Sequence, residues 1–116
     1  MRAFINGVEG GAIDLQKGAD VVYNIRVTND DGSLIDVTAD TDAQLILYDT
    51  ADRKNTAILS IVGAVVAAAQ GTLTATLTDA QTAALTSGAT YYAFVRRDAG
   101  STTYSFGNKH TAITMK

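Results

Sequence analysis

Apolar and polar residues alternate most regularly over residues 71–78. Leu73, Ala75 and Leu77 are separated by threonines, and residues 23–28 alternate in the same way. A period of two predicts strands with one buried and one solvated face, and threonine suits the solvated face of a strand. These two segments therefore predict half-buried strands that pack against another layer.

Two clusters of turn-forming residues predict hairpins. The run Asn-Asp-Asp-Gly at 29–32 favours a tight turn, so residues 33–37 are expected to return antiparallel. A second turn at 98–101 is expected to join strands at 91–97 and 102–106.

The remaining elements follow from shorter patterns. Further strands are predicted at 2–5, 13–15, 43–49, 56–62, 65–69 and 111–115. A helix over 64–69 is the alternative for the alanine-rich segment, but it lacks a cap and is short for an isolated helix. Thr78 and Gln81 have the spacing of a capping box, which predicts one or two helical turns over 79–85.

Length and composition indicate one folded domain, residues 1–116. Hydrophobic residues make up 47% of the chain and charged residues 18%, which is typical of a folded protein of single-domain size. About seven to nine short strands with regular turn signals predict an all-β fold, an antiparallel β-sandwich or barrel.

Composition also excludes several classes of function. The chain has no cysteine, so thiol catalysis and thiolate metal sites are excluded. Its net charge of −3 disfavours nucleic acid and anionic membranes as partners. The N-terminus does not read as a secretory leader, and the longest apolar stretch, 61–69, is too short to span a bilayer. We therefore expect a chain that works in a cytoplasm or leaves it without a cleaved signal.

Catalytic chemistry is not expected. His110 is the single histidine, and the nearby Ser105 and Asp98 fall in a hairpin without a strained nucleophile turn. A partly exposed loop histidine is the favoured interpretation, and we expect no catalytic residues and no cofactor.

A cluster of aspartates raises the question of a cation site. Its members are Asp30, Asp31, Asp36, Asp40 and Asp42. Their spacing does not fit a calcium loop that ends in glutamate, and each lies at a turn or just before a strand. We therefore favour turn chemistry over a weak cation site, and we expect no resident metal.

The spacing of Leu85, Gly88 and Tyr91 is that of a tyrosine corner. If Tyr91 and the residues at 93 and 95 face the core, then Tyr92, Phe94 and Arg96 face outward as a candidate contact surface. In the alternative register, Tyr92 and Phe94 are instead a core pair.

Several segments along the chain form a recognisable pattern of turns and hydrophobic spacing. They are DLQKG at 14–18, DGSLID at 31–36, GTLTATLT at 71–78, QTAAL at 81–85, GATYY at 88–92, DAG at 98–100, Gly107 and the final strand. This pattern resembles that of small immunoglobulin-like β-sandwich domains of tailed-bacteriophage virions. Such domains include the N-terminal domain of baseplate upper proteins and related tail-fibre and head-decoration domains.

The resemblance implies an antiparallel immunoglobulin-like β-sandwich in a virion structural protein that is assembled in the host cytoplasm. A capsid decoration or cement protein fits best, because this chain ends directly after the sandwich. Its partners would be the major capsid protein or other virion proteins, with further copies of itself in a homo-oligomer. A tail, neck or baseplate adaptor is the alternative. A carbohydrate-binding module is disfavoured by the absence of tryptophan.

A second candidate contact segment is the N-terminal arm, residues 1–6. It contains Arg2 and Phe4 and is expected to be able to add to a neighbour's sheet edge.

Overall fold

Buried apolar side chains from two facing β-sheets form the centre of the molecule. The computed structural model describes residues 2–38, 42–54, 56–99, 102–104 and 111–115, which contain ten strands and one α-helix. The strands are β1 (Arg2–Ile5), β2 (Ala12–Leu15), β3 (Val21–Thr28), β4 (Asp42–Tyr48), β5 (Leu59–Val62), β6 (Ala64–Ala67), β7 (Thr72–Leu77), β8 (Thr90–Ala99), β9 (Thr102–Tyr104) and β10 (Thr111–Met115). The helix is α1 (Asp79–Ala83), and a 3-10 turn covers Ala68–Gln70.

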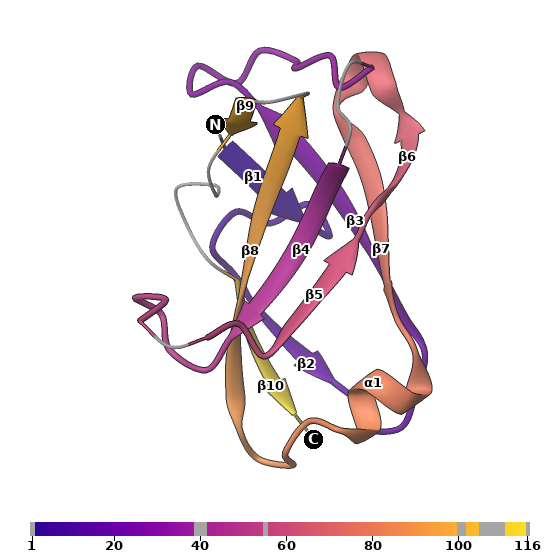
Figure 1. Ribbon diagram of the computed structural model, residues 1–116, viewed down its shortest axis with the longest axis vertical. Coiled ribbons are helices and arrows are strands. Elements are labelled where there is room, and N and C mark those ends of the chain that lie inside the picture. The colour runs from indigo at the N-terminus through magenta and orange to yellow at the C-terminus, as the bar shows by residue number, and fades with distance from the viewer. Residues whose placement is uncertain (1, 39–41, 55, 100–101, 105–110, 116) are drawn as a thin grey trace.

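The strand order is that of an immunoglobulin-like sandwich. The first sheet has the order β1-β3-β7-β6, and the second has the order β2-β10-β8-β4-β5, with β9 paired to β8 (Figure 1). In immunoglobulin domains, one sheet has the strand order A-B-E-D and the other has the order G-F-C. The two sheets of this chain have the same connectivity, with further strands added to the second sheet. The predicted all-β, immunoglobulin-like sandwich is therefore confirmed, although the described strands exceed the expected seven to nine.

One strand pair departs from the antiparallel rule. β2 runs parallel to β10, whereas the other pairs of named strands in the described chain are antiparallel. The chain therefore places its first two short strands in different sheets, β1 beside β3 and β2 beside β10.

The core consists of the inward-facing residues of both sheets. Leu73, Ala75 and Leu77 are buried, and the threonines between them lie on the outer face. This is the alternation that the sequence predicted. The largest fully buried apolar side chains are Leu15, Tyr23, Ile25, Val27, Val37, Leu45, Leu47, Leu73, Leu77, Ile113 and Met115.

The expected return strand at 33–37 is not formed. Only Leu34 makes a bridge, to Thr28, and the rest of the segment is irregular. Asp31 accepts hydrogen bonds from the backbone N–H and hydroxyl of Ser33, and Asp36 does the same for Thr38. These carboxylates satisfy backbone donors locally, which competes with a strand ladder.

Other element boundaries shift by a few residues. The strand expected over 56–62 begins at Leu59, and the helix expected over 79–85 ends at Ala83. The segment 65–69 lies partly in β6 and partly in the 3-10 turn. It therefore forms part of a strand and part of a short helical turn. Of the turn and strand expected over 98–106, positions 100–101 and 105–106 lie outside the described residues.

Two sequence motifs fix the connection between β7 and β8. Thr78 and Gln81 form the predicted capping box, each side chain accepting from the other's backbone N–H. The Tyr91 hydroxyl accepts a hydrogen bond from the Thr86 backbone N–H at 3.0 Å, which confirms the tyrosine corner.

No helix in the described part of the chain is long and apolar enough to cross a membrane.

Gly71 lies where no larger residue fits. Its φ is +64°, and a Cβ there would lie 2.6 Å from the Val27 carbonyl oxygen and 2.8 Å from that of Ile35. Gly88 has a similar φ of +79°, but a Cβ would meet nothing within 4 Å. Substitution of Gly88 therefore carries only the cost of the left-handed backbone, whereas substitution of Gly71 adds the cost of a clash.

We expect Gly71→Ala to lower the free energy of unfolding by about 3 kcal/mol or more, and Gly88→Ala by only about 1 kcal/mol. Urea denaturation of both variants measures the difference. Equal losses at the two positions would contradict the close packing of β7 against β3.

Tyr23 places a hydroxyl in the core. The side chain is 0% exposed, and its oxygen has no hydrogen-bond partner among the described residues. Burial raises the pKa of Tyr23 to about 12, because the charged phenolate is disfavoured in an apolar site.

We expect Tyr23→Phe to raise the free energy of unfolding by up to about 1 kcal/mol, because an unpaired buried hydroxyl is removed. Above pH 10 the unfolded chain releases this proton while the folded chain keeps it, so the wild type should lose about 2 to 3 kcal/mol between pH 10 and 12. Urea denaturation across this range should show a smaller loss for Tyr23→Phe. Identical pH profiles would mean that the phenol is solvated.

Candidate interaction surface

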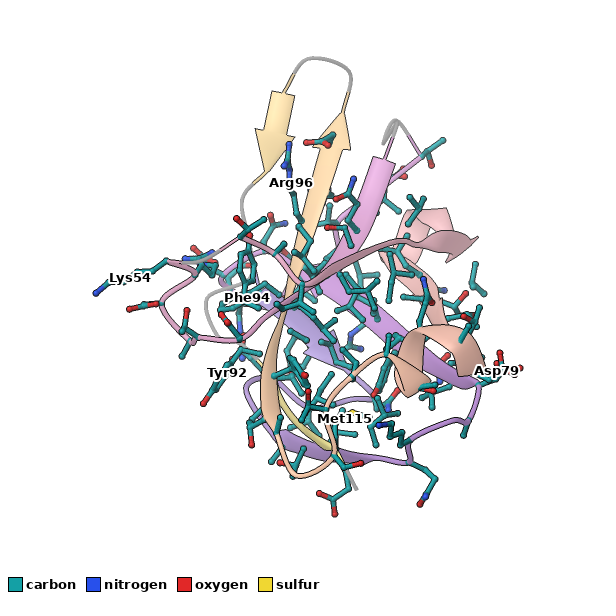
Figure 2. The ribbon with its side chains drawn as sticks, turned by 60° about the horizontal axis from the view of Figure 1, so that its bottom comes forward. Lys54, Asp79, Tyr92, Phe94, Arg96 and Met115 are labelled. Atoms are coloured by element: carbon teal, nitrogen blue, oxygen red, sulfur yellow. The ribbon has the colours of Figure 1, made fainter. Side chains whose placement is uncertain are left out.

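Alternate residues of β8 lie on opposite faces of the second sheet. Tyr91, Ala93 and Val95 belong to the core between the sheets, whereas Tyr92, Phe94 and Arg96 lie along the outer face (Figure 2). The predicted register is therefore correct, and the alternative that paired Tyr92 with Phe94 in the core is wrong.

Phe94 is nevertheless not available for contact, which corrects the expectation of two exposed aromatic residues. It is only 5% exposed. The ring of Tyr48 meets it edge-on with centroids 5.8 Å apart, and the Arg53 guanidinium lies 4.6 Å from its centroid. Ile46, its neighbour on β4, is buried too. These residues form a small cluster on the outer face of the second sheet, with Phe94 at its centre.

Tyr92 and Arg96 remain partly accessible on either side of this cluster. Both are half-buried, and the Nε of Arg96 lies 3.5 Å from an Asp98 carboxylate oxygen. The adjacent Arg97 turns inward and is buried. The two arginines therefore point to opposite faces and do not form a basic patch.

The second pair of predicted contact residues lies on the first sheet. Phe4 of β1 is half-buried, with the guanidinium of Arg2 5.3 Å and that of Arg26 5.1 Å from its ring centroid. Arg26 is its cross-strand partner on β3. We call Arg2, Phe4 and Arg26 the Phe4 group.

The two arginines of the Phe4 group differ in their charge balance. Arg2 donates to both carboxylate oxygens of Glu9, at 3.0 and 3.3 Å. This hydrogen bonding, together with the charge of Glu9, raises the pKa of Arg2. Arg26 is exposed and has no ion pair among the described residues. The guanidinium of Arg26 is thus the one in the group without a carboxylate partner among the described residues.

A hollow of about 240 Å³ opens beside the Phe4 group. It lies over the outer face of the first sheet, and its lining residues are Phe4, Gly7, Asn24, Ile25, Arg26 and Thr72. The hollow combines an aromatic ring and an arginine, which are residue types enriched where proteins contact one another, with the polar side chains of Asn24 and Thr72.

The two predicted sets of contact residues lie on different sheets. Tyr92, Phe94 and Arg96 lie on the second sheet, and Arg2 and Phe4 lie on the first. The sequence patterns did not single out Arg26, Arg53 or Tyr48. Arg26 was predictable as a solvated residue of an alternating strand, but its position opposite Phe4 depends on a pairing register that local pattern does not reveal.

The N-terminal arm is a strand of the chain's own sheet. Residues Arg2–Ile5 pair antiparallel with β3, and Ile5 and Val8 exchange backbone hydrogen bonds across the following turn. Addition of this arm to a neighbour's sheet stays a prediction.

Two members of the aspartate cluster, Asp31 and Asp36, bond to nearby turn residues. Hydrogen bonds from Ser33 lower the pKa of Asp31, and those from Thr38 lower the pKa of Asp36. Asp40, the side chain of Asp42, Ser105 and His110 lie outside the described residues. Among the residues that are described, no three histidine, aspartate or glutamate side chains are grouped to hold a metal ion.

We expect Phe94→Ala to lower the free energy of unfolding by about 2 to 4 kcal/mol, because it leaves a cavity beneath Tyr48 and Arg53. Tyr92→Ala, two residues away on the same strand and half-buried, should cost less than half as much. Thermal and urea denaturation of both variants measure this. Equal costs would restore Phe94 as a candidate contact residue.

No family of known proteins matches the chain, and no curated protein matches it.

Proposed function

We propose that this chain is a structural protein of a bacteriophage virion. Specifically, we propose a capsid decoration or cement protein that binds the outer shell, through non-covalent contacts with the major capsid protein. The immunoglobulin-like strand order and the turn motifs that resemble phage sandwich domains support this proposal.

The observation that carries the proposal is the Phe4 group on the outer face of the first sheet. Two guanidinium groups lie over its ring beside a hollow, and Arg26 is exposed without an ion pair among the described residues. Aromatic residues and arginine dominate the binding energy of many protein interfaces. The Phe4 group therefore supports a role in adhesion.

The packing between the sheets points to the same kind of role. Apolar side chains fill the space between the sheets, so the outer faces and the sheet edges are the surfaces that remain for contact. A shell offers the same binding site many times, and a weak contact repeated by symmetry is enough to cover it.

The copy number of the chain in purified virions tests this proposal. We expect quantitative mass spectrometry to find copies in the hundreds per particle, as a symmetric shell requires. A few to dozens of copies would favour the alternative, a tail, neck or baseplate adaptor. Absence from the particles would overturn both.

A binding measurement tests the Phe4 group itself. Purified chain is added to shells that lack it, and the bound fraction is measured after sedimentation. We expect Arg26→Ala to weaken binding by about tenfold. Lys17→Ala, which removes one positive charge from an exposed loop, should have little effect. Equal binding by the two variants would place the contact on another surface.

A further inference from the structure

We infer that the chain associates with a second copy of itself along the edge formed by β5 and β6. The two strands are consecutive and lie on one side of the molecule, with β5 at the edge of the second sheet and β6 at the edge of the first (Figure 1). We call residues 59–67 the β5–β6 edge.

Among the described residues, the hydrogen-bond pattern leaves part of β5 unpaired. The Gly63 N–H donates to the Ala43 carbonyl oxygen, and the register of β4 with β5 continues from this pair without interruption. Hydrogen-bonded and non-hydrogen-bonded residue pairs alternate in an antiparallel ladder. The backbone N–H and C=O groups of Ile61 are therefore directed to β4. Ser60 and Val62 therefore direct their N–H and C=O groups away from β4, towards the open side of the sheet.

The edge is apolar as well as open. Val62 is 69% exposed and Val66 63% exposed. The chain has no charged residue between Lys54 and Asp79, although its net charge is −3. Exposed apolar edge strands are sites of strand pairing unless charges or covering segments protect them. The β5–β6 edge lacks charges, so two copies can approach there without like-charge repulsion.

The edges formed by β1 and β2 are better protected. At the edge of the first sheet, Ile5 of β1 is bonded to Val8 of the following turn, and Arg2 is paired with Glu9. At the edge of the second sheet, β2 carries the exposed carboxylate of Asp14.

The geometry of β5 favours an identical partner. Its two outward-directed residues are separated by one residue, Ile61. A two-fold axis at Ile61 places Ser60 of each copy opposite Val62 of the other, so that each donor faces an acceptor in an antiparallel ladder. The two second sheets then join into one continuous sheet.

Sedimentation velocity of the full chain, from micromolar to millimolar concentration, tests this inference. We expect a concentration-dependent dimer, and we expect Val62→Lys to weaken the association by at least about tenfold. Val22→Lys is the matched control, because Val22 is 55% exposed on the outer face of β3, a middle strand. A monomer at every concentration, or equal association of the two variants, would overturn the inference.

Hydrogen exchange of the wild type gives a second readout that does not depend on how the variants fold. The amides of Ser60 and Val62 should become protected as the concentration rises. Fast exchange of both amides in the associated protein would place the contact elsewhere and overturn the inference. A monomeric chain that still binds shells would refute this pairing and leave the proposed function intact.

Discussion

The fold depends on the burial of alternate strand residues between the two sheets. Burying one side chain of the size of leucine contributes about 1.5 to 3 kcal/mol, and most strands supply such residues to the layer. Because successive side chains point to opposite faces, a shift of one residue in any strand would exchange its buried and exposed sets. The same constraint that fixes the core therefore fixes which residues face outward.

Outward orientation alone does not make a contact residue. Phe94 and Phe4 both lie on outer faces of sheets and both have an arginine over the ring. Phe94 is further covered by Tyr48 and is buried, so its ring stabilises the second sheet. Phe4 stays half-buried beside a hollow, next to an exposed arginine. The same residue types thus serve the fold in one sheet and remain available for binding in the other.

The sequence predicted what local physics determines. The faces of β3, β7 and β8, the capping box at Thr78 and the tyrosine corner at Tyr91 all depend on residues close in the chain, and all are present. The return strand at 33–37 was predicted wrongly because Asp31 and Asp36 bond to nearby backbone donors instead. Contacts that depend on the pairing of distant segments could not be predicted from local sequence patterns. Examples are the parallel pairing of β2 with β10, Arg26 opposite Phe4, and the Arg53 side chain over Phe94.

The proposed dimer and the proposed shell contact are compatible in geometry. A two-fold axis perpendicular to the second sheet rotates one copy within the plane of that sheet, so each face of the sheet stays on the same side. The outer faces of both first sheets therefore point in the same direction. Both Phe4 groups then face one underlying surface at once. A dimer bound through two such groups gains from the high effective concentration of the second group once the first is bound. Two shallow contacts that are weak singly could in this way hold a small sandwich on a large particle, without a deep interface on either copy.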